Sequence, residues 1–359
     1  MSAPAQKVSY QQLHTFTKGA FQAVGLSAAD AQTAADVLVT TDAWGVFTHG
    51  TKNLHGYAKL LKAGGLSAKG KPQVVSEGPA WAIVDGNAVL GLITSVFAMQ
   101  VAIAKAKTTG IAYVGVRNSS HFGAAGYYTW LAAQAGMIGL SMANDTPSVA
   151  APGSRGAITG SNPFSYAAPA GRHRSLALDM SIATVAGGKV YAARQRGESI
   201  PNNWLIGGDG KPTSDPSGFP EVGALQPAAG HKGYGLALMV EVLAGLLTGA
   251  GVTKQISSWM FADPAKPTGH GAAFIVIDVK AMQSLEKFVQ RTESMIEEIH
   301  QSSRAEGVER IYVPGEMEWE RYNRAHLEGI SLPSDVVASL RDAAIISGQN
   351  LELALGVHV

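Results

Sequence analysis

The chain has 359 residues, of which 46% are hydrophobic and only 15% charged, a composition that favours a compact, enzyme-like, oligomeric body and excludes a disordered one. Lys and Arg total 28 against 27 Asp and Glu, so the net charge of +1 argues against nucleic-acid or anionic-membrane partners. The absence of cysteine excludes disulfides, thiolate metal sites and cysteine nucleophiles, and it fits a cytoplasmic protein.

The predicted elements begin with three helices. Residues 7–25, 28–47 and 52–63 have the amphipathic spacing of helices. Ser27 is a plausible N-cap of the second helix, and Asp30 completes a capping-box-like pair with it.

Strands and helices then alternate, which predicts an α/β protein. After a polar linker over 69–77, a strand at Trp81–Val84 is predicted to turn at Asp85-Gly86 and return as a hairpin. The later elements, in order, are a helix at 90–108, a buried strand at 111–117, a helix at 125–135, a strand at 137–143, a strand-like segment at 164–181, a helix at 182–196, an apolar helix from 230 to 247, a strand at 273–278, a helix at 282–304 and a helical tail. The Pro-, Gly- and Asp-rich stretch 200–228 is long for a plain connection and predicts a functional loop.

No segment is predicted to enter or cross a membrane. The N-terminal sequence lacks the apolar core of a signal peptide. The longest apolar stretch, Tyr234–Val252, contains Glu241 and four glycines, which favours a buried helix over a membrane span.

The common catalytic fingerprints are missing. Gly233-Tyr234-Gly235 has neither a third glycine nor a preceding apolar strand, so a Rossmann dinucleotide fold is not supported. The nucleophile elbow, the P-loop and H-E-x-x-H are absent as well. The candidate catalytic and binding residues are therefore the polar clusters at the ends of the predicted helices and strands.

Two histidines stand out in these clusters. His49 falls where the second helix ends, and imidazole is the side chain best suited to exchange a proton near neutral pH; a surface cap histidine is the alternative. His121 follows a buried strand, where either a functional or a structural role is open. Asp145, Asn162 and Asp179 also follow strand-like runs, although each alone is typical of a turn or cap.

An anion site is one interpretation of His231-Lys232-Gly233. Free N–H groups at a helix N-terminus, together with the lysine, suit a phosphate or carboxylate. A glycine-rich helix start with a solvated lysine is the alternative. Pro314-Gly315-Glu316, taken alone, is an ordinary turn.

Taken together, the clusters resemble the malate/L-lactate dehydrogenase type 2 family over residues 8–320. The blocks that carry the resemblance are Asn118-Ser-Ser-His-Phe-Gly, Gly160-Ser-Asn-Pro, Leu178-Asp-Met-Ser, Gly230-His-Lys-Gly-Tyr-Gly and Pro314-Gly-Glu. The family includes sulfolactate dehydrogenases, ureidoglycolate dehydrogenase, diketogulonate reductase and cyclic imino acid reductases.

This resemblance implies an α/β fold with a mixed central sheet and a non-Rossmann NAD(P)-binding domain. The expected domains are a helical one (1–75 with 317–359), an α/β one (76–117 with 260–316) and the cofactor-binding one (118–259). It also implies a homodimer that uses NAD or NADP to interconvert a small 2-hydroxy acid and its 2-oxo or imino counterpart by hydride transfer.

The resemblance also implies roles for individual residues. His49 becomes the general acid of the reductive direction, His121 a second acid/base group, and Thr48, Lys52 and Asn53 substrate neighbours. No metal is implied. The expected cofactor contacts are Asp145, Ser161, Asn162, Asp179, Met180, Ser181, His231, Lys232, Gly233, Pro314, Gly315 and Glu316.

Two residues depart from the family pattern. Thr48 replaces a serine and keeps its hydroxyl, whereas Asn53 replaces the arginine that holds the substrate carboxylate. Asn cannot provide a charged bidentate clamp. Lys52 or Arg155 could substitute for it, but the favoured hypothesis is a substrate with an amide or hydroxyl at this end, bound by Asn53.

Two rival functions remain open at this stage. One is a catalytically inactive relative that binds nucleotide in a structural or regulatory role, for which Asn53 is the best argument. The other is a metal-dependent lyase or hydrolase using His49, His55 and His121, although these lack the usual ligand spacing.

Overall fold

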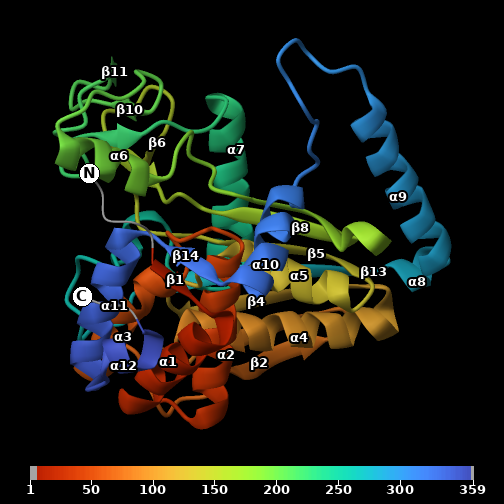
Figure 1. The fold of residues 1–359 in the computed structure, drawn as a ribbon, viewed down its shortest axis with the longest axis horizontal. Coiled ribbons are helices and arrows are strands. Elements are labelled where there is room, and N and C mark those ends of the chain that lie inside the picture. Colours follow the sequence, from red (N-terminus) through yellow and green to blue (C-terminus); the bar gives the residue numbers. More distant parts are fainter. Residues whose placement is uncertain (1–5, 357–359) are drawn as a thin grey trace.

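A seven-stranded mixed sheet forms the centre of residues 6–356, the part of the chain that the computed structural model describes (Figure 1). Its strands, in spatial order, are β2 (Gln73–Gly78), β3 (Trp81–Asp85), β4 (Ile111–Ser119), β13 (His270–Asp278), β5 (Met137–Ala143), β8 (Phe164–Pro169) and β9 (Ser175–Met180). Neighbouring strands are antiparallel apart from the parallel pair β3 and β4. This confirms the mixed central sheet that the family resemblance implies.

The topology brings particular strand ends together. Because β4 and β5 both run antiparallel to β13, their C-terminal ends meet the N-terminal end of β13 at one edge of the sheet. The N-terminal end of β8 and the C-terminal end of β9 reach the same edge, since Met142 pairs with Phe164 and Phe164 with Met180. Polar residues that follow or precede these ends are therefore neighbours in space.

Successive side chains along each strand point to opposite faces of the sheet, and helices cover both faces. Val114 and Val116 of β4 are buried in the main core beneath α4 (Gly91–Thr109), whereas α5 (Ala125–Gln134) packs on β5, β8 and β9. Tyr113 points to the opposite face and donates from its hydroxyl to the backbone oxygen of Leu243 at 2.6 Å. Leu243 belongs to the helix that covers this second face.

A helical layer joins the two ends of the chain. It contains α1 (Tyr10–Ala23), α2 (Ala28–Ala43), η1 (Thr51–Asn53), α3 (Leu54–Ala63), α10 (Glu316–Glu328), α11 (Ser334–Ser347) and α12 (Leu351–Leu355). A short antiparallel pair, β1 (Gln6–Val8) with β14 (Ile330–Leu332), ties the N-terminal segment to the C-terminal one. Residues 1–5 and 357–359, the ends of the predicted helical domain, lie outside the described residues.

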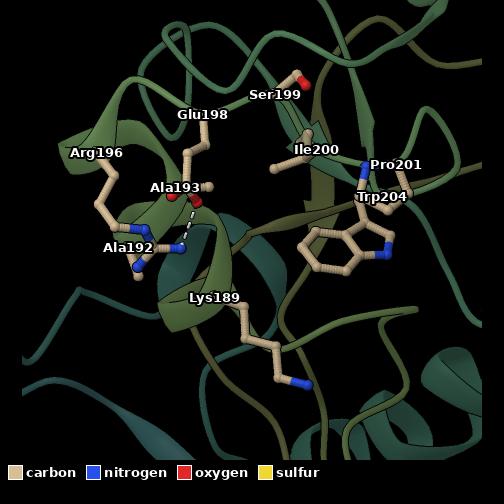
Figure 2. A pocket seen from close by; sticks show the side chains of 9 residues that line it. All are labelled: Lys189, Ala192, Ala193, Arg196, Glu198, Ser199, Ile200, Pro201 and Trp204. Carbon is tan, nitrogen blue, oxygen red and sulfur yellow. Dashed lines mark ion pairs between the residues drawn. The ribbon is translucent and has the colours of Figure 1, made fainter.

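A second, smaller sheet packs around its own apolar core. It contains β6 (Val149–Ala150), β7 (Ala157–Thr159), β10 (Leu205–Ile206), β11 (Pro212–Thr213) and β12 (Ala224–Leu225), beside α6 (Gly187–Arg196). The stretch 200–228 supplies three of these strands. A pocket of about 340 Å³ lies between α6 and residues 198–204. Figure 2 shows the side chains that line it, among them the ion pair of Arg196 and Glu198. Its lining includes none of the residues predicted for the functional site.

The remaining elements lie around the central sheet. They are η2 (Gly171–His173), α7 (His231–Val240), the π-helical turn Glu241–Leu246, η4 (Thr253–Gln255), α8 (Val279–Met282) and α9 (Leu285–Gln301). In Figure 1, α9 and the loop after it project from the body of the molecule.

Several predicted boundaries are corrected. The hairpin partner of β3 is β2, which precedes it inside the predicted linker, and residues after Gly86 lead into α4. Segment 164–181 is the two antiparallel strands β8 and β9. The helix predicted from 182 begins at Gly187, because Ala183 forms an isolated bridge with Pro227. Ser27 does cap α2, and its hydroxyl donates to the Asp30 carboxylate.

The apolar stretch Tyr234–Val252 is not the buried helix that the sequence predicts. It forms α7 and the π-helical turn, and only the side facing the sheet is buried. Exposed large apolar side chains on the other side are Leu236, Leu238, Val242, Leu246 and Leu247. Among residues 6–356, no helix has both the length and the apolar character required to cross a membrane.

Candidate active site

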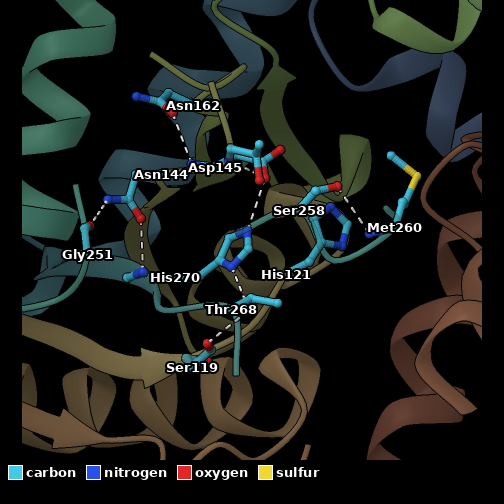
Figure 3. A network of polar contacts seen from close by, with 12 residues as sticks. Ser119, His121, Asn144, Asp145, Asn162, Gly251, Ser258, Met260, Thr268 and His270 are labelled. Carbon is cyan, nitrogen blue, oxygen red and sulfur yellow. Dashed lines mark hydrogen bonds and ion pairs between the residues drawn. The ribbon is translucent and has the colours of Figure 1, made fainter. Parts of the chain in front are cut away.

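Five polar segments gather at the sheet edge where β4, β5 and β9 end and β13 and β8 begin. They are residues 118–121, 144–145, 161–162, 179–181 and 268–270. The sequence predicts that polar residues follow these strands, and the strand order explains why they come together. Figure 3 shows the part of this cluster around His121, Asp145 and His270.

His121 is held on two sides. Its Nδ1 lies 2.6 Å from the hydroxyl of Tyr57, which is fully buried in α3. The ring of Trp259 stacks on the imidazole, with 4.6 Å between centroids and 20° between planes. Burial lowers the pKa of His121 to about 3, against a weaker opposing effect of the Asp145 charge. This imidazole is therefore neutral near neutral pH, with Nε2 directed away from Tyr57.

His49 lies beside His121, with 5.8 Å between ring centroids. Its Nδ1 is 2.9 Å from the hydroxyl of Thr48. Burial lowers its pKa, and the negative charge of Asp145 counteracts that effect. The structure thus brings together the two histidines that are 72 positions apart in the sequence (121 − 49).

Asp42, in α2, holds the loop that carries His49. One carboxylate oxygen, Oδ2, accepts from the Thr51 backbone N–H at 3.0 Å and from its hydroxyl at 2.5 Å. The other, Oδ1, has no hydrogen-bond partner among the described residues. A Cβ at Gly50 would lie 1.8 Å from Oδ1, so this close approach requires glycine. Burial raises the pKa of Asp42 to about 7.

We expect Asp42 to make stability depend on pH. The folded protein retains the Asp42 proton more strongly than the unfolded chain, whose carboxyl has a pKa of 3.8. This contribution is therefore full below pH 3.8 and is lost as the pH rises to about 7. The unfolding free energy of the wild type should fall over that range, by at most about 1.4 kcal/mol per pH unit. Denaturation of Asp42→Asn at several pH values should lack this slope, whereas Asp209→Asn, an exposed control, should retain it. Equal slopes in all three proteins would contradict the assignment.

Asn53 and Lys52 point in different directions. The Asn53 amide donates to the Thr48 backbone oxygen at 3.1 Å, underneath the His49 loop. Lys52 instead forms a 2.7 Å ion pair with Asp335 of α11. Arg155, in the smaller sheet, has its Nε 3.4 Å from the Gly208 oxygen. Both candidate cations are thus engaged by residues outside the histidine cluster.

Asp145 faces the histidines and contacts a residue that the sequence analysis did not single out. Its Oδ1 lies 3.0 Å from Nε2 of His270, and the Thr146 N–H donates to the same oxygen at 2.7 Å. These contacts hold the pKa of Asp145 below its usual range despite burial. The sequence analysis did not single out His270, because it places the start of this strand at residue 273. In the structure the strand begins three residues earlier, at His270 (273 − 270).

Tyr57 and Trp259 were also missed. A signal for Tyr57 was present, because it is four residues after Asn53 on the same helix face. Trp259 comes from an irregular segment between η4 and β13, and sequence spacing gives no indication that it reaches His121.

The predicted cofactor segments border this cluster. Ser161 and Ser181 are adjacent, since the Ile182 N–H donates to the Ser161 oxygen at 2.9 Å. Met180 pairs with Phe164 in the sheet. Asp179 accepts from the Gly126 N–H at the start of α5, at 2.7 Å. Gly233 lies within the first turn of α7 and has no room for a side chain, because a Cβ there would meet the Ala228 oxygen at 2.1 Å.

The start of α7 has the features of an anion site. No described side chain caps the helix at Gly230, and in its first turn the Lys232 N–H donates to the Ala229 oxygen at 3.4 Å. His231 and Lys232 in the first turn are exposed.

The Pro314–Glu316 turn attaches to β9. The Ala177 N–H donates to the Pro314 oxygen at 3.0 Å, and Gly315 has a φ of 95°. The Glu316 carboxylate is engaged within the protein, by His300 at 2.8 Å and Arg310 at 3.3 Å. Over residues 6–356, no group of three His, Asp or Glu side chains is placed to hold a metal ion.

The known proteins to which this chain is similar include several dehydrogenases. The sequence pattern of the malate/L-lactate dehydrogenase family matches residues 8–341. The chain is 36% identical to a malate dehydrogenase of Pyrococcus horikoshii, covering 94% of each protein. It is 34% identical to a ureidoglycolate dehydrogenase (NAD(+)) of Escherichia coli O157:H7, covering 94% of this chain and 96% of the relative. The solved structure of sulfolactate dehydrogenase from Methanocaldococcus jannaschii superposes with a TM-score of 0.88 at 33% identity, over 97% of this chain and 99% of that one.

Proposed function

The chain belongs to the malate/L-lactate dehydrogenase family, and on this basis we propose that it moves a hydride between a nicotinamide cofactor and a small 2-hydroxy acid or its 2-oxo or imino counterpart. Its relatives are dehydrogenases and an imine reductase, so the chain is an oxidoreductase. The inactive nucleotide-binding alternative finds no support among these relatives. The observation that carries the proposed chemistry is the pair of histidines, His49 and His121, beside Asp145.

The residues present fit a dinucleotide. The uncapped, exposed start of α7, with Lys232 in its first turn, offers N–H groups and a positive charge for the diphosphate. The buried hydroxyl of Thr146, next to Asp145, has no hydrogen-bond partner among the described residues and adds an unused polar group to the site. When bound, the nicotinamide ring supplies or accepts the hydride. The choice between NAD and NADP is open, and the remaining predicted contacts, Ser161, Met180 and Ser181, border the same edge.

His49 is the proton donor of the reductive direction in this proposal. Charge develops on the carbonyl oxygen or imine nitrogen as hydride arrives, and an imidazolium both stabilises and protonates it. His121 has a pKa too low to be protonated near neutral pH. If the Tyr57 hydroxyl donates to Nδ1 of His121, Nε2 carries the proton and donates a hydrogen bond to the same substrate atom.

Asn53 defines the substrate end of the site in this proposal. Its amide is already bonded beneath the His49 loop, and neither Lys52 nor Arg155 is directed to replace the missing arginine. Burying a carboxylate without a charged or hydrogen-bonding partner costs free energy. In this proposal the substrate therefore carries a neutral amide or hydroxyl at the end where the family pattern predicts a carboxylate held by arginine.

Binding of the reduced cofactor tests the first part of the proposal. NADH or NADPH should cause a saturable change in the fluorescence of the six tryptophans, with calorimetry as confirmation. Lys232→Ala should weaken this binding by about tenfold, since it removes a charge-assisted contact. Lys287→Ala, an exposed lysine on α9, is the matched control. Absence of saturable binding with both nucleotides would contradict the proposal.

A homodimer belongs to the same proposal. The exposed apolar side chains of α7 and the π-helical turn are better buried than solvated, and Leu246 is 63% exposed. Leu246→Asp should reduce the mass measured by light scattering from two chains to one. Leu327→Asp, at an 86% exposed leucine of α10, is the control and should remain dimeric. A wild type that scatters as one chain would refute the dimer. A cytoplasmic location, which a cysteine-free sequence accommodates, completes the proposal.

A further inference from the structure

The indole ring of Trp259 lies against both members of a hydrogen-bonded pair in the candidate site. Tyr57 and His121 are joined by the 2.6 Å contact between the tyrosine hydroxyl and Nδ1. The indole stacks on His121 with 4.6 Å between centroids and 20° between planes, and on Tyr57 with 5.2 Å and 29°. Figure 3 shows Ser258 and Met260, the chain neighbours of Trp259, beside His121. One side chain is thus placed to hold the pair as a unit.

The orientation of His121 needs more than its hydrogen bond. A single contact at Nδ1 leaves the tilt of the imidazole loosely defined, since the outer torsion of a histidine side chain has broad minima. A ring stacked on the imidazole face opposes this tilt, because rotation separates the two planes. Tyr57 and Trp259 therefore restrain different motions of His121, and together they fix the direction of its Nε2 atom.

The loop that carries Trp259 is anchored at two points. At its base, near the start of β13, the Ser257 N–H donates to the Thr268 oxygen at 3.0 Å. Further along, the Pro264 oxygen accepts from the Gly65 N–H, just after α3, at 3.1 Å. The loop therefore connects the edge of the sheet with the helical layer, and Trp259 is held between His121 from one and Tyr57 from the other.

Gly56 leaves the space that the indole occupies. It precedes Tyr57 within α3, where alanine would favour the helix more than glycine does. A Cβ at Gly56 would lie 2.9 Å from Cζ3 of Trp259, closer than van der Waals contact. The close approach of the indole to the helix backbone explains why this helical position has no side chain.

We propose that Trp259 is a positioning residue, which stacks on His121 and Tyr57 and so aims Nε2 of His121 at the reacting atom of the substrate. This inference rests on the proposed function, in which Nε2 donates a hydrogen bond to that atom. Trp259 acts through His121, so its loss should slow the chemical step and leave the binding of the cofactor unchanged.

An NMR signal of His121 tests the positioning without turnover. The protein is labelled with ¹³C at histidine Cε1, and the His121 signal is assigned by its loss in His121→Gln. In the wild type, the ring current of the stacked indole should shield this signal. Gly56→Ala should displace the indole and reduce the shielding, and Trp259→Leu should remove it. Adding Trp259→Phe to Gly56→Ala should restore part of the shielding, because phenylalanine lacks the Cζ3 atom that the new methyl group would meet.

The kinetic test uses the same variants. In Gly56→Ala and Trp259→Leu, kcat of the reductive reaction should fall by about tenfold, with KM for the cofactor unchanged. The double variant Gly56→Ala/Trp259→Phe should recover part of the kcat lost in Gly56→Ala. Gly56→Ala adds only a methyl group to a helix, so it keeps the test valid if Trp259→Leu does not fold.

A glycine in another helix provides the matched control. A Cβ at Gly19 of α1 would also lie 2.9 Å from a side chain, the Oε1 atom of Gln349. Gly19→Ala should leave both kcat and the His121 signal unchanged. An unchanged signal in either Gly56→Ala or Trp259→Leu, an equal movement in Gly19→Ala, or a moved signal with wild-type kcat would each overturn the inference. A moved signal in a protein whose wild type turns over no substrate would count against the proposed function alone.

Discussion

His49→Asn should lower kcat of the reductive reaction by about 10²–10⁴-fold, the usual cost of removing a general acid. Cofactor affinity should change little, because the contacts of His49 are with Thr48 and His121 and not with the residues proposed to bind the cofactor. Stopped-flow single-turnover measurements with saturating cofactor separate the chemical step from binding.

The comparison with His121 makes this expectation specific. His121→Asn should also slow the reaction, but its pH profile should keep the same protonation step, because His121 is neutral throughout that range. Tyr57→Phe, which removes the partner of Nδ1, should cause part of the His121 effect. If His121→Ala abolishes turnover while His49→Ala leaves it largely intact, the two roles are reversed.

Asn53→Arg should raise kcat/KM for simple 2-oxo acids such as pyruvate by about tenfold, since a charge-assisted pair is stronger than a neutral hydrogen bond. The unmodified protein should use these acids poorly and with a high KM. Asn53 is buried beneath the Thr48–His49 segment, so the new side chain must emerge beside His49 to act. Asn53→Gln adds length without charge and is the matched control.

The outcome for the wild type also decides the substrate hypothesis. Turnover of pyruvate or oxaloacetate with a KM of about 1 µM–1 mM, the ordinary range for enzymes, would refute the assigned role of Asn53. So would an equal gain in Asn53→Gln.

Local sequence patterns predicted most of the helices and strands. Apolar runs with turn residues at their ends located β4 and β5, and Ser27 located the start of α2. The failures arose where pairing partners decide the structure. β2 is a mostly exposed edge strand with little apolar signal, and its pairing with β3 replaced the predicted hairpin.

The apolar helix after Gly230 shows a second limit of sequence patterns. In the sequence, the leucines on the outer side of α7 cannot be distinguished from buried leucines. Only the position of the sheet reveals which side of the helix is covered. An uncovered apolar side within one chain is what a partner surface would produce, and periodicity within a single helix cannot show it.

In the candidate site, the sequence indicated strand ends but not which ends meet. His121 and Asp145 were singled out because each follows a strand, whereas their proximity follows from β13 inserting between β4 and β5. His270 and Trp259 reach the site from a segment more than 100 residues away in the sequence (259 − 145 = 114), so no local pattern predicts their contacts.

Oxidation of the reduced nicotinamide across a panel of substrates tests the central claim most directly. The loss of NADH or NADPH absorbance is followed with 2-oxo acids, their amide or hydroxyl derivatives and cyclic imines, using the wild type and His49→Asn. The account predicts turnover of at least one compound lacking the simple carboxylate end, strongly reduced in His49→Asn. Binding of the nucleotide without oxidation by any member of the panel would contradict it.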